Sequence, residues 1–77
     1  NLSENNSLYE TIVVTINDFF VLKYLNNKIK YQEMIKLIYE YSNYKEFLKY
    51  RKILPKKVTD IYRLRDYVSV KLSSLGI

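Results

Sequence analysis

The sequence contains no cysteine, no histidine and no tryptophan, and only one glycine and one proline among its 77 residues. Without cysteine there is no disulfide framework, no thiol nucleophile and no cysteine-ligated metal. Without histidine there is no imidazole base and no histidine-ligated metal. The single glycine is the penultimate residue, Gly76, which excludes a glycine-rich loop that cradles a phosphate. We therefore predict no catalytic, cofactor-binding or metal-binding residue in this chain.

Long apolar runs are absent as well. A transmembrane helix needs about 20 mostly apolar residues, and four polar residues interrupt the most apolar stretch, residues 8–25: Glu10, Asn17, Asp18 and Lys23. The polar lead-in, residues 1–6, lacks the basic and apolar regions of a signal peptide. We expect a cytoplasmic protein without a membrane partner. The initial Asn1 indicates a processed product or a part of a longer polypeptide.

What the sequence does contain is typical of a helical domain. Hydrophobic residues make up 48% and charged residues 27% of the chain, which are ordinary values for a globular domain. A chain of this length forms one domain at most, and the scarcity of glycine and proline in its interior favours helices joined by short links. We predict an all-α fold: a single domain, residues 1–77, built as a small bundle of three to four helices.

The first helix is predicted over residues 8–25. Ser7 and Glu10 form a capping-box pattern at its start, and Asn26-Asn27 provides a signal for its end. The β-branched residues within 11–16 are also compatible with a strand. Helix is favoured because the apolar pattern continues well beyond the length of a strand.

This predicted helix is apolar on two sides. Its broad face, assigned to the core, carries Tyr9, Ile12, Val13, Ile16, Phe19, Phe20 and Tyr24. A second, narrower stripe carries Val14, Asp18, Val21, Leu22 and Leu25. Because a helix with two apolar faces lies centrally in a bundle or against a further partner, we predict that the stripe is a domain or subunit interface. For Asn17-Asp18, a polar contact to a partner or ligand and a merely exposed or helix-packing role both stay open.

Three further helices are predicted, over residues 31–42, 44–53 and 58–72. The apolar stripe of the first of these consists of Tyr31, Met34, Ile35, Leu37, Ile38 and Tyr41. The stripe of the last consists of Val58, Ile61, Leu64, Val68 and Leu72. Both are ordinary amphipathic patterns of helices that pack on a core. Pro55 separates the last two helices, because the residue before a proline is disfavoured in helical geometry.

Charge is concentrated in the second half of the chain. The net charge is +5, yet residues 1–44 carry four basic and five acidic groups, whereas residues 45–77 carry nine basic and three acidic groups. The nine cations are Lys45, Lys49, Arg51, Lys52, Lys56, Lys57, Arg63, Arg65 and Lys71. A solvated surface is the favoured interpretation. Nucleic acid or another anionic partner is the alternative, although no nucleic-acid-binding motif is present.

The carboxylates are expected to make structural contacts. General acid–base catalysis needs two carboxylates that converge in a pocket and have different pKa values, and no pair in this sequence has a spacing that indicates such a pocket. We expect local contacts instead, such as Glu33 with Lys36, and Glu46 with Lys49 or Tyr50.

Residues 11–38 follow a distinctive order of motifs. The Asn17-Asp18 step is followed by Tyr24-Leu25, a turn over residues 26–29, and the helix that Tyr31 opens. This order resembles the C-terminal domain of the 1-deoxy-D-xylulose 5-phosphate reductoisomerase family, where Asn-Ala-Ala-Asn-Glu leads through Phe-Leu and a short turn to an amphipathic helix opened by an aromatic residue. Residues 58–72 are similar to the family's last helix. The sequence departs from the family pattern at Val14, Thr15, Ile16, Phe19, Phe20, Arg65 and Ser69.

The resemblance implies a function for a parent polypeptide. The family's enzyme rearranges and reduces 1-deoxy-D-xylulose 5-phosphate in isoprenoid biosynthesis, and it uses NADPH and a divalent metal that are bound in domains outside these 77 residues. The implied role of this chain is a non-catalytic structural domain. Its partner is then the remainder of the parent polypeptide or a second subunit. The alternative is an independent, small, basic helical module that binds nucleic acid or a protein through residues 45–77.

Overall fold

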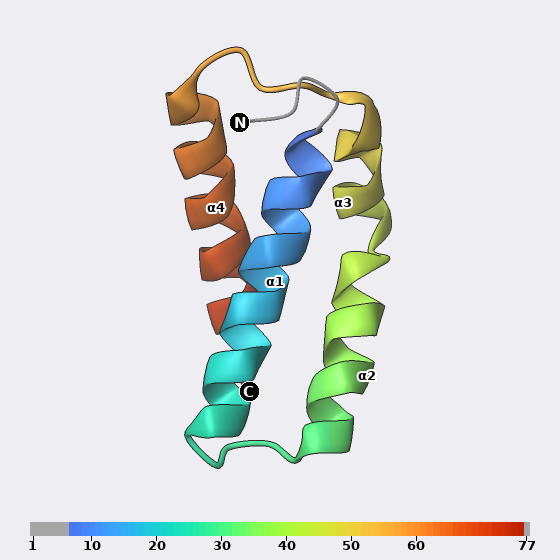
Figure 1. The fold of residues 1–77 in the computed structure, drawn as a ribbon, viewed down its shortest axis with the longest axis vertical. Coiled ribbons are helices and arrows are strands. Elements are labelled where there is room, and N and C mark those ends of the chain that lie inside the picture. The colour runs from blue at the N-terminus through green and yellow to red at the C-terminus, as the bar shows by residue number, and fades with distance from the viewer. Residues whose placement is uncertain (1–6, 77) are drawn as a thin grey trace.

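Residues 7–76 are described by a computed structural model, and they form an arrangement of helices (Figure 1). The elements are α1 (Leu8–Leu25), α2 (Tyr31–Ser42), α3 (Lys45–Leu48), the 3-10 helix η1 (Lys49–Lys52) and α4 (Val58–Ser73). No strand occurs among the described residues, and the predicted all-α fold is confirmed. The polar lead-in predicted for residues 1–6 lies outside the described residues.

Both ends of α1 follow from local side-chain chemistry. At the start, the Ser7 hydroxyl accepts a hydrogen bond from the Tyr9 amide at 3.3 Å, which satisfies one of the amides that a helix leaves unpaired. At the end, Asn27 adopts a positive φ of 59°, a left-handed conformation that asparagine tolerates better than most residues. The β-branched residues between these ends are therefore helical, as the length of the apolar pattern predicted.

Carboxylates support the first turns of α2 and α4. Glu33 accepts a hydrogen bond from the Lys30 amide at 3.0 Å, so it caps its own helix and does not form the expected ion pair with Lys36. Asp60 accepts hydrogen bonds from the amides of Lys56 at 2.9 Å and Lys57 at 3.2 Å. Negative charge at a helix N-terminus also interacts favourably with the helix dipole.

The third predicted helix, 44–53, is shorter and less regular than expected. Only Lys45–Leu48 is α-helical, and η1 tightens the chain over the next four residues, as often happens at the end of a helix. Ile53 is extended, and its carbonyl accepts a hydrogen bond from the Leu8 amide at 2.7 Å. This bond ties the segment that leads to α4 to the start of α1.

α1 is the central element of the molecule. It runs between α4 on one side and α2 with α3 on the other (Figure 1), and it packs against α4, α2 and η1. The described residues extend over 37 × 24 × 19 Å, so the molecule is elongated. The helices that flank α1 leave a part of its surface uncovered, where Val14, Leu22 and Leu25 are exposed.

The core lies on one side of α1. Its nine buried hydrophobic side chains are Leu8, Ile12, Ile16, Phe20, Met34, Phe47, Leu64, Val68 and Leu72. Thr15 is also buried, and its hydroxyl donates to the Thr11 carbonyl at 2.7 Å, so its polar group is satisfied. The sequence pattern assigned neither Leu8 nor Thr15 to the core.

Four side chains that the pattern assigned to core-facing stripes are exposed: Tyr24, Tyr31, Ile35 and Val58. Three of them stand in the first or last turn of a helix, where the neighbouring helices leave one side open. Tyr24 and Tyr31 instead pack edge-to-face on each other, with ring centroids 5.7 Å apart. They hold the turn between α1 and α2 together from its outer side.

Aromatic rings connect three helices. Phe20 of α1 stacks on Tyr41 of α2 with ring centroids 5.7 Å apart, and Tyr41 lies 4.7 Å from Tyr44. Tyr44 in turn stacks on Phe47 of α3 at 5.9 Å. Such pairs add about 0.5–1.5 kcal/mol beyond the burial of area, so this chain of rings fixes α2 and α3 on one flank of α1.

Candidate functional site: an exposed face on the central helix

The structure places most of the predicted interface stripe at the surface of α1. Val14, Leu22 and Leu25 are 57%, 59% and 65% exposed, although each is a large apolar side chain. Asp18 is exposed between them, and Val21 is half-buried and packs against the core. The stripe predicted from the sequence is thus largely an exposed apolar surface. Its function as an interface stays a prediction.

Asp18 is the charged group of this surface. It stands one turn after Val14 and one turn before Leu22, so its carboxylate is set among apolar side chains. Within residues 7–76 the structure holds one ion pair, between Lys71 and Glu46, which leaves Asp18 without a cation partner among these residues.

A groove between α1 and α4 continues the stripe. It encloses about 300 Å³, and its wall is formed on α1 by Thr11 and Val14 and on α4 by Ile61 and Arg65, with Pro55 at one end. Glu10 also lines it, so its lining holds an acidic group on α1 and a basic group on α4. The sequence pattern gave no sign that Arg65 and Ile61 lie beside Val14, because that proximity depends on how the two helices pack.

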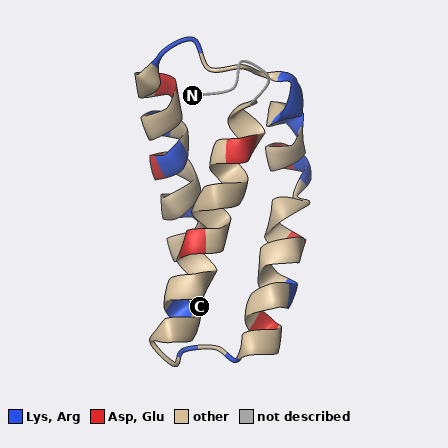
Figure 2. Ribbon diagram, viewed as in Figure 1, with Lys and Arg blue, Asp and Glu red and all other residues tan. Residues whose placement is uncertain are grey.

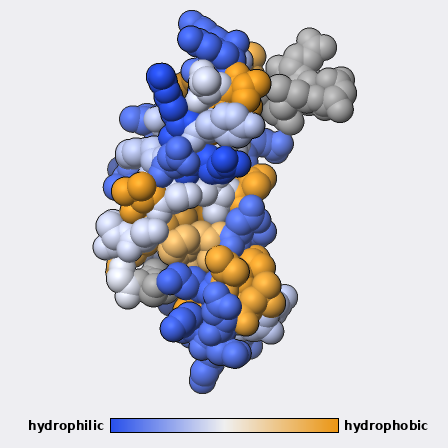
Figure 3. Space-filling model, turned by 90° about the vertical axis from the view of Figure 1, so that its left-hand side faces the viewer, coloured by the Kyte–Doolittle hydropathy of each residue, from blue (hydrophilic) through white to orange (hydrophobic). Residues whose placement is uncertain are grey.

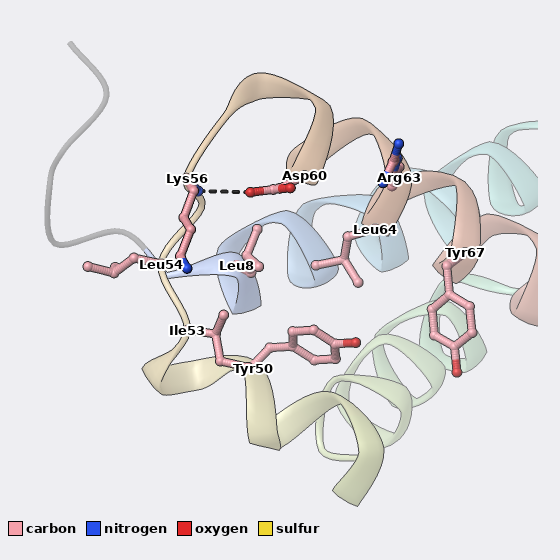
Figure 4. Close-up of a pocket in the computed structure, with 9 residues that line it drawn as sticks. All are labelled: Leu8, Tyr50, Ile53, Leu54, Lys56, Asp60, Arg63, Leu64 and Tyr67. Atoms are coloured by element: carbon pink, nitrogen blue, oxygen red, sulfur yellow. Dashed lines mark hydrogen bonds between the residues drawn. The ribbon is translucent and has the colours of Figure 1, made fainter.

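A second pocket, of about 420 Å³, lies near the start of α1 (Figure 4). Its middle is apolar, since Leu8, Ile53 and Leu64 lie around the hollow with the ring of Tyr50, whereas Leu54 extends away from it. The charged groups of this pocket are Lys56, Asp60 and Arg63.

Asp60 has a structural function in that pocket. Its hydrogen bonds from the Lys56 amide and then the Lys57 amide lower the pKa of its carboxyl below the ordinary value. The carboxylate is therefore ionised and directed at the backbone of the link before α4. It is not poised to exchange a proton near neutral pH.

Glu46 links α3 to α4. Its carboxylate accepts a hydrogen bond from the Tyr67 hydroxyl at 2.9 Å and lies 3.2 Å from the Lys71 ammonium. The hydrogen bond with Tyr67, followed by the attraction of Lys71, lowers the pKa of Glu46, and the same contacts raise the pKa of Tyr67 and of Lys71. Of the expected local contacts of Glu46, Lys49 acts on it only through its charge, which also lowers the pKa of Glu46; the hydrogen bond and the ion pair of Glu46 are instead made with α4.

The cations of the second half are spread over three elements. Figure 2 shows them on α3 and η1, on the link that follows, and along α4, so they form no single stripe. Several lie over aromatic rings of the chain itself: Arg51 is 5.5 Å from the Tyr9 ring and Arg65 is 5.0 Å from the Tyr62 ring. In these contacts one side of each guanidinium group lies near an aromatic ring of the chain itself.

Hydrophobic and hydrophilic groups separate along the molecule when it is viewed from the α4 side. In Figure 3 hydrophobic side chains gather in the middle and lower part, between hydrophilic groups above and below. Exposed apolar residues of α1 include Val14 and Leu22, and those of α4 include Val58 and Val70. Groups of exposed apolar side chains mark interaction sites more often than isolated ones do.

Within residues 7–76, no helix has both the length and the apolar character needed to cross a bilayer. In the same residues no three carboxylates gather closely enough to hold a metal ion.

The fold and its surfaces define a small all-α domain with an uncovered apolar face on its central helix. Over all 77 residues the chain is 42% identical to 1-deoxy-D-xylulose 5-phosphate reductoisomerase of Pelagibacter ubique (strain HTCC1062). The chain spans 20% of the length of that protein. The resemblance seen in residues 11–38 and 58–72 is thus confirmed, and it extends over the whole chain. No protein-family model and no solved structure matches the chain.

Proposed function

We propose that the chain is the C-terminal helical domain of a 1-deoxy-D-xylulose 5-phosphate reductoisomerase, and that it supports the catalytic domain without contributing catalytic residues. The observation that carries this proposal is the 42% identity to the Pelagibacter enzyme over every residue of the chain. Its support from within the sequence is the order of motifs in residues 11–38, which resembles the C-terminal domain of that family.

The contacts of the carboxylates favour a structural role. Glu33 and Asp60 cap helices, and Glu46 joins α3 to α4. Each of these groups is used to hold the fold together. Asp18 is the acidic group on the uncovered stripe of α1, a surface that suits association with another part of a protein.

The parent enzyme is then an oxidoreductase of isoprenoid biosynthesis that uses NADPH and a divalent metal. The residues described here do not fit the metal, because their carboxylates do not converge. We assign both the metal and the NADPH to domains outside these 77 residues, and no chemical step is assigned to this chain.

A chimeric enzyme tests the proposal. The segment of the Pelagibacter reductoisomerase to which this chain is similar is replaced by the 77 residues, and NADPH oxidation with 1-deoxy-D-xylulose 5-phosphate is measured. We expect the chimera to retain activity and the host enzyme without the segment to lose it. We also expect the 77 residues alone to show no turnover.

Two results would contradict the proposal. A chimera that folds, as judged by circular dichroism and a cooperative thermal transition, but does not oxidise NADPH would show that the chain cannot replace the host segment. Turnover by the 77 residues alone would show that the chain has a catalytic site of its own.

A further inference from the structure

We propose that the groove between α1 and α4 receives an amphipathic helix from another part of the parent polypeptide. This inference rests on the proposed function, because it takes the chain to be one domain of a longer protein. The Pelagibacter relative is about five times as long as this chain, which spans 20% of it, so most of such a polypeptide is available to cover the groove.

The shape of the surface fits a helix. Val14 and Leu25 are separated by three turns of α1, about 16 Å along the axis. The exposed stripe residues 14, 18, 22 and 25 follow one another in steps of four, four and three, the spacing of side chains that share one face of a helix. At one end, Val14 and Ile61 form the wall of the 300 Å³ groove, which gives such a helix a second surface on α4.

The charges of the groove specify the chemistry of its occupant. Glu10 lines the groove on α1 and Arg65 lines it on α4, and Asp18 stands on the stripe one turn beyond Val14. A helix in the groove therefore needs an apolar stripe, a lysine or arginine over α1, and a carboxylate or other acceptor over α4. Burying Asp18 without such a cation is unfavourable, because a buried charge must be paired.

The acidic groups also argue against nucleic acid at this face. The phosphate backbone is repelled by carboxylates such as Glu10 and Asp18, and among the described residues Arg65 is the one cation that lines the groove. A second copy of this chain is the alternative occupant, and cross-linking from position 14 distinguishes it from a helix of the parent polypeptide.

Cysteine labelling measures whether the stripe is covered. The chain has no cysteine, so Leu22→Cys and, as a matched control, Tyr39→Cys on α2 can be introduced into the chimera. Both positions are exposed in the 77-residue structure, at 59% and 72%. Labelling rates of the folded and urea-unfolded chimera are compared for each labelled peptide by mass spectrometry.

We expect the thiol at position 22 to be protected about tenfold or more by folding of the chimera, since it reacts only when the covering helix opens. The thiol at position 39 is expected to react at close to its unfolded rate. An active chimera in which both thiols react equally fast would overturn the docking proposal and leave the proposed function intact. An inactive but folded chimera would instead count against the proposed function.

A photo-crosslinker in place of Val14 identifies the occupant. The expected product is an intramolecular cross-link to a host segment that has helical apolar spacing and a lysine or arginine opposite Asp18. A cross-link to a second copy, to a loop, or to no segment at all would overturn the proposal.

Charge reversal tests the predicted pairing. Asp18→Lys is expected to lower the Tm of the chimera, whereas Asn17→Lys, one residue away and outside the stripe, is expected to leave it unchanged. Equal effects of the two variants would show that Asp18 faces no cation.

Discussion

The two faces of α1 carry side chains of the same kind but have different surroundings. On one face Ile12, Ile16 and Phe20 are fully buried by α2, α3 and α4, whereas on the other Leu22 and Leu25 are more than half exposed. Burying a leucine is worth about 1.5–3 kcal/mol. The buried face is thus explained by the folding of this chain, whereas the exposed face adds little to that folding, and we propose that another part of the parent protein covers it.

The largest effect is expected from a charged substitution on the buried face. Ile16→Asp places an unpaired charge in the core and should cost about 4–5 kcal/mol or more, which is comparable with the whole stability of a small domain. The matched change on the other face, Leu22→Asp, should alter the unfolding free energy of the 77-residue chain by about 0.5 kcal/mol or less. Thermal unfolding followed by circular dichroism measures both. Similar losses would show that the two faces do not differ.

A smaller effect is expected from a cavity beside the same face. Phe47 of α3 is fully buried and stacks on Tyr44, so Phe47→Ala should cost about 3–5 kcal/mol. Urea unfolding of the 77-residue chain measures the loss, and Tyr39→Ala on the exposed side of α2 is the control. A loss of about 1 kcal/mol or less would mean that α3 is not part of the core.

Acidification tests the carboxylate at the start of α4. The pKa of Asp60 is lower in the folded chain than its ordinary value of 3.8, because the Lys56 and Lys57 amides donate to its carboxylate. The stabilisation is therefore present above that ordinary value and is lost as the pH falls through the lower folded pKa. We expect Asp60→Asn to lower the Tm at neutral pH and to reduce the fall in Tm on acidification. An unchanged pH dependence in the variant would contradict this function of Asp60.

The smallest effect is expected at the contact between α3 and α4. The pKa of Glu46 is lowered by the Tyr67 hydroxyl and by Lys71, so its stabilisation is also lost as the pH falls below the ordinary glutamate value. Because the pair is partly exposed, its contribution is small. Glu46→Gln should lower the Tm by a few degrees at most, and Tyr67→Phe should produce a part of that change. A larger effect of Tyr67→Phe than of Glu46→Gln would show that the carboxylate is not the centre of the contact.

The helices themselves could be predicted because their signals are local. Ser7 caps α1, Asn27 takes the left-handed conformation, and Pro55 separates the last two helices. These features depend on residues within a few positions of one another. The extent of α3 could not be predicted, because the 3-10 turn and the bond from Leu8 to Ile53 depend on where α1 lies.

The burial of individual side chains was harder to predict. Ile35 and Val58 follow the apolar spacing of their helices but are exposed, and the half-burial of Val21 separates it from the rest of its stripe. Helical spacing shows which side chains share a face of a helix. The angle at which neighbouring helices cross determines which of those side chains are covered. For the same reason Glu46 found its partners on α4, 21 residues away for Tyr67.

The central claim is that the exposed face of α1 is covered in the parent protein. It is tested most directly by the Tm of Leu22→Asp measured twice, in the 77-residue chain and in the chimera with the Pelagibacter enzyme. In the 77-residue chain we expect a Tm close to that of the unmodified chain. In the chimera we expect a fall of several degrees, because the new carboxylate is buried only in the chimera. An equal change in both proteins would contradict the claim.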